Sequence, residues 1–178
     1  MKTSELALNV RNFRGQSFIE FAVFIPILMI CLFVSVEFGM AYTQAQKVTN
    51  LSREIAYAAY RDCADATTAP NNVLTNCLSA KLNDVQSTIS NTMLPNFSQR
   101  GTLILSVYDS VGSKTVSNPA NPPAAHATKF TAGDATLMSY DGRVIIGEVF
   151  YDYTAVTPVN NLLHLAKFPS VLYETAVY

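Results

Sequence analysis

One uninterrupted apolar run restricts what this chain can fold into more than any other feature. Between Glu20 and Glu37 lie 16 residues, FAVFIPILMICLFVSV, without a single charge. The segment from Phe18 to Tyr42 has 25 residues and only these two acids, one near each end. As an α-helix it would be roughly 37 Å long, enough to cross a bilayer core of about 30 Å. A core helix of a soluble domain usually has a polar side, which this segment lacks. The sequence therefore predicts a membrane span at about 18–42.

The charges before the span predict its orientation. Three basic residues precede it against one acid, Glu5; they are Lys2, Arg11 and Arg14. Because basic flanks stay in the cytoplasm, we expect the N-terminus inside and the residues beyond about 43 outside. A cleaved secretory signal is the alternative, with the small residues GMA at 39–41 as a cleavage motif. The apolar core is longer than the usual 7 to 15 residues of such signals, and it contains Pro26, so a retained span is favoured.

Composition argues against several classes of function. The chain has 12 Lys and Arg against 13 Asp and Glu, whereas a nucleic-acid surface normally shows a basic excess. Its two histidines, His126 and His164, have no His, Cys or acid nearby at metal-ligand spacing. No glycine-rich phosphate loop or nucleophile motif occurs. We therefore predict a protein that is not an enzyme, with no catalytic residue, metal or cofactor and no nucleic-acid partner.

The two acids at the span have different surroundings. Glu37 lies where the sequence turns polar, and it can be interpreted as a marker of the membrane interface. Glu20 is embedded in apolar sequence, where a carboxylate is costly unless it is paired. A cut between Gly15 and Gln16 would create an ammonium group four residues away, which is one helical turn. Such an ammonium, in the same chain or in a packed neighbour, would compensate the charge of Glu20.

This segment resembles a known family of membrane proteins. RG followed by QSFIEF resembles the processing site of class III type IV prepilins, which a membrane prepilin peptidase cuts after the glycine. The continuation EFAVFIPILMICLFVSVEFGMAY is similar to the N-terminal signature of TadE-like pseudopilins of the tight-adherence (Flp) pilus system. The resemblance spans residues 14 to about 60. The residues that carry it are Glu20, Phe21, Pro26, Glu37, Phe38 and Gly39.

The resemblance implies a function and a location. Residues 1–15 would be a cytoplasmic leader, and the mature chain would be a minor pilin or pseudopilin that supports pilus assembly and surface adhesion. A major Flp pilin has little beyond its helix, whereas this chain has more than a hundred residues after the span. Implied partners are the prepilin peptidase, the inner-membrane assembly platform, the bilayer and other pilins, which pack on the N-terminal helix. The implied location is the inner membrane, with a periplasmic C-terminus or incorporation into an extracellular pilus.

Two other functions stay open from the sequence alone. The chain could be a signal-anchored bitopic protein whose outer domain binds a ligand or catalyses a reaction. It could also be a type II secretion pseudopilin, although those proteins usually carry Gly-Phe-Thr-Leu-Ile-Glu where this chain has Gly-Gln-Ser-Phe-Ile-Glu. The mature N-terminus distinguishes the bitopic protein from the prepilin.

The sequence predicts two helices, and the first of them includes the span. The first covers residues 16–62, and its outer half is amphipathic; a second helix at about 73–93 has apolar residues three or four apart. Cys63 and Cys77 lie on these two helices, in a compartment where disulfides persist. We predict a disulfide between them, with two unpaired buried cysteines as the alternative. Cys31, in the middle of the span, is interpreted as a small apolar residue.

Beyond the second helix the periodicity changes to two. TLILSVYD at 102–109 and VLYETAVY at 171–178 alternate as strands do, and TLMSYDGRVIIGEVFYDY predicts a hairpin turning at Asp141-Gly142. Its long arm, 143–154, places Asp152 on the polar side, where we expect solvent. The sequence therefore predicts an α+β fold, in which residues 63–178 form a head with an antiparallel sheet of about four strands on a helical stalk.

Overall fold

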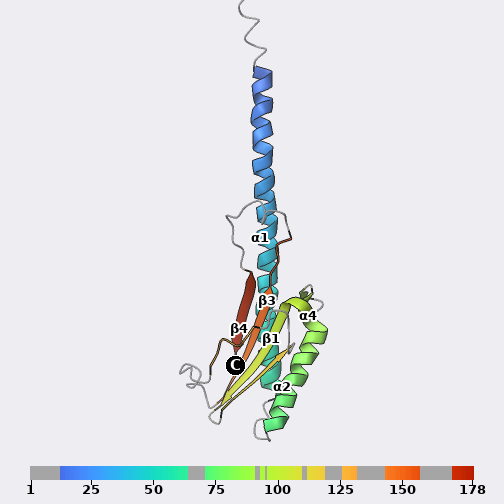
Figure 1. The fold of residues 1–178 in the computed structure, drawn as a ribbon, viewed down its shortest axis with the longest axis vertical. Coiled ribbons are helices and arrows are strands. Elements are labelled where there is room, and N and C mark those ends of the chain that lie inside the picture. The colour runs from blue at the N-terminus through green and yellow to red at the C-terminus, as the bar shows by residue number, and fades with distance from the viewer. Residues whose placement is uncertain are drawn as a thin grey trace, which may run out of the picture. The chain divides into compact units, whose positions relative to one another are not determined.

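The computed structural model describes residues 13–63, 71–90, 93–94, 96–109, 112–118, 126–131, 143–156 and 170–178. The predicted turn at Asp141-Gly142 and His164 lie outside the described residues. Figure 1 shows a long N-terminal helix, a shorter second helix and a sheet, and this confirms the α+β fold. The helices are α1 (Phe13–Cys63), α2 (Asn71–Val85), the π-helical η2 (Gln86–Ser90) and α4 (Phe97–Arg100). The strands are β1 (Gly101–Asp109), β2 (Gly112–Asn118), β3 (Arg143–Asp152) and β4 (Val171–Val177).

The chain divides into two compact units. One comprises Met1–Met40 with Ala155–Lys167, and the other comprises Ala41–Thr154 with Phe168–Tyr178. Helix α1 contributes its first part to the first unit and its remainder to the second. The first unit contains the apolar run, and the second contains the sheet. We call the second unit the head.

The first part of α1 exposes apolar side chains on all its sides. Exposed fractions run from 75% at Phe18 to 40% at Ile30, and Phe38 is still 66% exposed. The helix is long enough to cross a membrane, and the mean hydropathy of its most apolar 18 residues is 2.6. Among the described residues it is the one helix that meets this test. A surface of this extent in a soluble monomer would be unusual, so lipid or other helices are expected around it.

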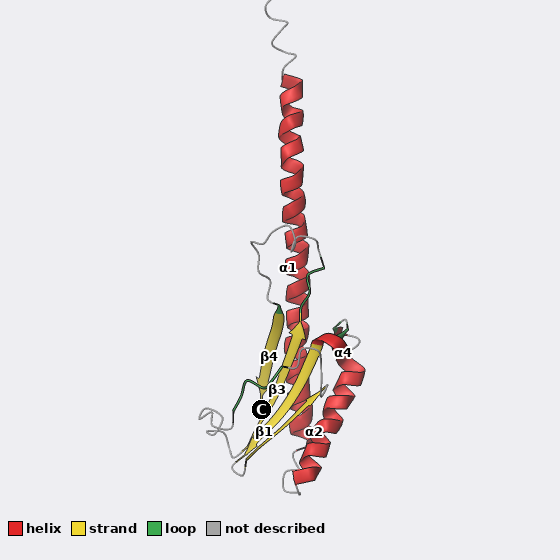
Figure 2. Ribbon diagram, in the orientation of Figure 1, coloured by secondary structure: helices red, strands yellow, loops and turns green. Residues whose placement is uncertain are grey.

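The head is built on a four-stranded antiparallel sheet with the order β2-β1-β3-β4 (Figure 2). Leu105 of β1 lies opposite Gly147 of β3, and Val149 of β3 lies opposite Glu174 of β4. Because side chains alternate across a strand, the register assigns Leu105, Gly147 and Val149 to one face. That face lies against the helices, since a Cβ on Gly147 would approach the backbone oxygen of Ser52 in α1 to 2.8 Å.

The helices cover this face with the apolar stripes that their sequences predict. Helix α1 buries Val48, Leu51, Ile55 and Ala59, and α2 buries Leu74, Leu78, Leu82 and Val85. Helix α2 packs against β2 and β1. The predicted second helix is continuous to about residue 93, whereas α2 ends at Val85 and continues as the π-helical turn η2.

The opposite face of the sheet is also covered. Residues 101–108 of β1 are all buried, although their alternation predicts only one buried face. Residues 126–131, which we call the strap, contribute to this cover, since Phe130 packs against Tyr108, Val144 and Ile146. The hydroxyl of Tyr108 also donates a hydrogen bond of 2.9 Å to the backbone oxygen of Phe130.

Two details of the predicted sheet are wrong. Strand β2, with the sequence GSKTVSN, was not predicted, because only one of its seven residues is a large apolar one. It pairs with β1 across two residues, so β1 and β2 form the hairpin of this sheet. Strand β3 pairs with β1 on one side and with β4 on the other. It therefore does not pair with the segment just before it, as the predicted hairpin required.

Candidate functional site

The predicted processing segment lies in helical backbone. Helix α1 begins at Phe13, three residues before the helix predicted from Gln16, and it therefore includes Gly15 and Gln16. In a continuous helix Gln16 and Glu20 are one turn, or roughly 6 Å of axial rise, apart. Glu20 and Phe21 are exposed on this helix, and Phe21 is 62% accessible. Pro26 lies inside the same helix.

Glu37 has surroundings that the sequence did not predict. It is fully buried, with 0% of its surface accessible. One carboxylate oxygen accepts a hydrogen bond of 3.1 Å from the backbone N–H of Val156, a residue 119 positions later. A buried carboxylate needs such partners, because burial without them would cost several kcal/mol, on the order of 2–7 for a polar group. Glu37 therefore attaches the chain that follows β3 to α1 within the first unit.

The rest of the Glu37-Phe38-Gly39 signature faces outward. Phe38 is exposed, and a Cβ built on Gly39 would have no atom within 4 Å. Helix-interior glycine costs about 1 kcal/mol relative to alanine. No crowding at Gly39 offsets that cost, so its small size does not serve packing among the described residues.

The end of α1 is joined covalently to α2. Cys63 and Cys77, the two cysteines paired in the sequence prediction, form a disulfide with their Cα atoms 5.9 Å apart. Cys31 is a free, exposed cysteine on the apolar part of α1. The disulfide closes a loop of 14 residues, which corresponds to about 3 kcal/mol in the chain-entropy view of disulfides.

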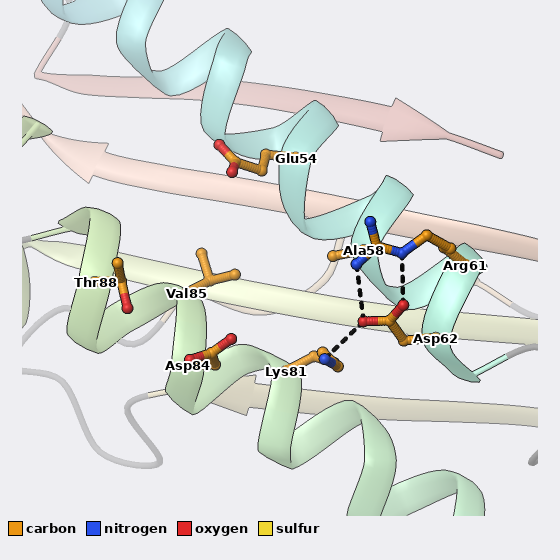
Figure 3. A pocket seen from close by; sticks show the side chains of 8 residues that line it. All are labelled: Glu54, Ala58, Arg61, Asp62, Lys81, Asp84, Val85 and Thr88. Carbon is orange, nitrogen blue, oxygen red and sulfur yellow. Dashed lines mark hydrogen bonds and ion pairs between the residues drawn. The ribbon is translucent and has the colours of Figure 1, made fainter.

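A pocket of about 240 Å³ lies beside this disulfide, between α1 and α2 (Figure 3). One carboxylate oxygen of Asp62 lies 2.6 Å from Nε of Arg61, and the other lies 2.7 Å from Nζ of Lys81. These hydrogen bonds, from Arg61 first and then Lys81, hold the pKa of the Asp62 carboxyl well below its usual range. The pocket is lined by Glu54, Ala58, Arg61, Asp62, Lys81, Asp84, Val85 and Thr88.

The chemistry of this pocket is that of a helix junction. Its ion pair between Asp62 and Lys81 joins α1 to α2 one turn from the disulfide. In the part of the chain that the structure describes, no three His, Cys, Asp or Glu side chains gather to hold a metal ion. The ion pairs of Asp62 with Arg61 and Lys81 give these charges a structural role at the junction of the two helices.

A second buried carboxylate, Glu148, organises the outer face of the sheet. Its side chain is fully buried, with 0% of the residue accessible. It accepts hydrogen bonds from the hydroxyl of Thr128, from the backbone N–H of Lys129 at 3.0 Å and from the hydroxyl of Tyr173 at 3.0 Å. Burial, followed by the hydrogen bond to Glu148, raises the pKa of Tyr173 well above its usual value. Glu148 thus connects β3, β4 and the strap.

The strap has two further attachments. Nε2 of His126 lies 3.1 Å from a carboxylate oxygen of Asp152, and the imidazole stacks on Phe150 at 4.7 Å between ring centroids. The ammonium of Lys129 lies 3.5 Å from the ring centroid of Tyr173, a cation–π distance. The side chain of Asp152 is 31% exposed between the buried Tyr151 and Tyr153, as predicted, and its contact with His126 was not predicted. Sequence offered no signal for these contacts, because the strap and β3 are brought together only by the tertiary fold.

Together, these features define a class of protein. An exposed apolar helix that could cross a membrane continues into a disulfide-linked helical layer, and that layer covers one face of a small antiparallel sheet. The helix could anchor the chain in a membrane, and the arrangement is consistent with a membrane-anchored, pilin-like protein.

The comparison with protein families identifies the N-terminal segment more closely. The model of the TadE-like protein family matches residues 15–56, which confirms the resemblance predicted from the sequence for the N-terminal part of the chain. The match begins at Gly15 and includes the apolar run and Glu37-Phe38-Gly39. Searches of curated proteins and of solved structures each found no match.

Proposed function

We propose that this chain is a minor pilin or pseudopilin of a Tad/Flp-type pilus, cut after Gly15 and assembled through its N-terminal helix. The observation that carries the proposal is the TadE-like match over residues 15–56, which lies on α1 and includes the apolar run that is exposed on all its sides. Such a surface suits a subunit that lies first among lipids and later among the helices of other subunits.

The placement of Glu20 supports the same mechanism. A cut after Gly15 creates an α-ammonium at Gln16, one helical turn from this carboxylate. Both charges would then lie at the edge of an apolar environment, where an unpaired charge is costly and a paired one is tolerated. Glu20 can pair with the ammonium of its own chain or of an adjacent subunit, and pairing with a neighbour would fix the axial position of one helix against another.

The head makes a non-catalytic, structural role coherent. Its titratable clusters are used to hold elements together: Asp62 joins the two helices, and Glu148 joins the strap to the sheet. We propose that the inner-membrane assembly platform and other pilins contact the helix. The head supports assembly and surface adhesion from the outer side of the membrane.

The mature N-terminus tests processing directly. Replacing Gly15 by alanine is expected to leave nearly all of the chain uncut, because the peptidase reads the glycine that precedes the cut. N-terminal sequencing and intact mass of protein from membranes and from sheared pili would show Gln16 as the first residue of the unaltered chain. Gly39→Ala is the matched control, since it makes the same change on the same helix without touching the cut.

Two results would contradict the proposal. One is a protein that retains Met1 in cells with an active prepilin peptidase, and the other is a mature chain that begins near Tyr42. Either outcome would favour a signal-anchored or secreted protein instead.

Replacing Glu20 by glutamine tests the carboxylate separately from the cut. We expect normal membrane insertion and normal processing, together with a loss of about tenfold or more in assembled subunit. Only about 1.4 kcal/mol per subunit is needed for a tenfold change in an equilibrium. The readout is the ratio of processed protein in sheared pili to that in membranes, with the exposed acid change Glu54→Gln as control. Wild-type assembly of the Glu20→Gln variant would show that the carboxylate is not used.

A further inference from the structure

Both edge strands of the head sheet have an outer side along which no described strand pairs. Strand β2 is one edge and β4 is the other, and each has seven residues. Unpaired strand edges are templates for pairing with another chain, and proteins usually protect them. Strand β4, with the sequence VLYETAV, contains no proline, no lysine and no glycine, and Glu174 is its one charged residue.

Each edge contains a single charged residue, and the two charges have opposite signs. Strand β2 has Lys114, and β4 has Glu174. Pairing β4 with β4 or β2 with β2 would bring like charges together, which destabilises a sheet, whereas pairing β4 with β2 brings opposite charges together. We propose that β4 of one copy of this chain pairs with β2 of a second copy, head to tail, to extend the sheet from one head to the next.

The backbone register permits this pairing. Ile145 exchanges both backbone hydrogen bonds with Tyr178, at 2.7 and 2.9 Å, so every second residue of β4 counted back from Tyr178 turns its backbone groups toward β3. Tyr173 and Thr175 therefore turn theirs toward the free edge. On the other edge, Asp109 and Gly112 close a hairpin across two residues. The closing pair of such a hairpin is hydrogen-bonded, so Ser113 and Thr115 turn their backbone groups outward.

One antiparallel register satisfies both edges at once. It places Tyr173 opposite Thr115 and Thr175 opposite Ser113 as hydrogen-bonded pairs, and it then places Glu174 directly opposite Lys114. Glu174 lies opposite Val149, and Lys114 lies opposite Val107, so both positions belong to the helix-facing side of the sheet. Residues opposite each other in a non-hydrogen-bonded pair have Cβ atoms about 4.5–5.5 Å apart, which suits an ion pair.

The helices on the sheet fit the same repeat. Four strands at about 4.8 Å spacing occupy about 19 Å, and two packed helices occupy about 16–20 Å. Helix α2 lies over β2 and β1, and α1 lies over β3, so the helix layer continues from copy to copy together with the sheet. Because the number of antiparallel strands is even, β2 of the next copy keeps its own direction. All copies then point the same way, as anchoring in one membrane requires, and the interface repeats without closing.

Disulfide trapping in the full-length chain tests this register. Two tagged copies are co-expressed with Cys31→Ser in both, one with Glu174→Cys and the other with Lys114→Cys, and are oxidised in the membrane. We expect a mixed-tag dimer, because the Cβ spacing of this pair lies within about an ångström of disulfide geometry. Pairing Glu174→Cys with Ser98→Cys, an exposed position on α4, is the matched control. A mixed dimer no more abundant than this control would overturn the proposal, as would efficient trapping of Glu174→Cys with itself.

Two further changes separate edge pairing from a chance collision. Thr175→Pro removes a backbone donor on the free edge but none from the ladder with β3, so we expect the Cys63–Cys77 disulfide to form and the mixed dimer to be lost. Glu174→Lys or Lys114→Glu alone should weaken association by up to about fivefold, and the double reversal should restore it. The reversals are read from co-purification of two differently tagged copies. Undiminished trapping of the Thr175→Pro chain would show that β4 does not pair with a second copy through its free edge.

Discussion

Replacing Glu148 by alanine is expected to destabilise the head by about 3 kcal/mol or more. The change removes the acceptor for the Thr128 hydroxyl, the Lys129 N–H and the Tyr173 hydroxyl in a place where water has no access. Each buried donor left without an acceptor costs about 1–3 kcal/mol, and the lost side chain leaves a cavity in addition. Glutamine keeps one acceptor oxygen, so Glu148→Gln should cost less than alanine.

Denaturant unfolding of the full chain in detergent would measure this loss. The chain has nine tyrosines and no tryptophan, so tyrosine fluorescence can follow the transition. Glu54→Ala is the control, because Glu54 is an exposed acid on α1 and such surface changes usually stay within about 0.5 kcal/mol. Equal stabilities of the Glu148→Ala and Glu54→Ala chains would mean that the carboxylate does not hold the strap to the sheet.

Replacing Gly147 by alanine is the second change with a large expected effect. A Cβ at this position would lie 2.8 Å from the backbone oxygen of Ser52 and 2.9 Å from side-chain carbons of Ala56 and Ile55. Backbone and core atoms of α1 cannot move aside as the end of a flexible side chain can, so α1 must shift away from β3. Such overpacking costs about 1–3 kcal/mol, and valine should be worse than alanine.

Gly39→Ala provides the contrasting case, on the helix α1 that Gly147 contacts. Its Cβ would meet no atom within 4 Å, so only the helix propensity changes, and stability should be unchanged or rise by up to about 1 kcal/mol. Thermal melts of the two variants, with the head signal followed by circular dichroism, would compare them. A Gly147→Ala chain as stable as Gly39→Ala would show that α1 does not approach β3 this closely.

The parts of the fold that depend on short-range pattern could be predicted from the sequence. The uncharged run after Glu20 predicted the long exposed apolar helix, because a segment of that length and hydropathy has few alternatives. The stripe on α2 is periodic, and Cys63 and Cys77 lie only 14 positions apart on successive helices, so their pairing could be predicted from sequence separation and compartment.

The parts that depend on distant residues could not be predicted. Strand β2 is polar, and it forms because it can pair with the backbone of β1. The strand propensity of its residues carries little information about such pairing. Glu148 lies on the same side of β3 as Asp152, but its burial depends on a strap some 20 residues away. The burial of Glu37 could not be predicted for the same reason, since its partner Val156 lies 119 residues further along.

The disulfide between Cys63 and Cys77 has a mechanical consequence. In the proposed pilus each subunit would bear tension, and a folded domain under tension lengthens when its loops and helices are drawn straight. The 14 residue steps between the two cysteines would release roughly 50 Å of contour length if they were free to extend. The covalent bond removes this length from the extensible chain. A pulled head therefore passes load from α1 to α2 through sulfur, even after the ion pair of Asp62 and Lys81 has broken.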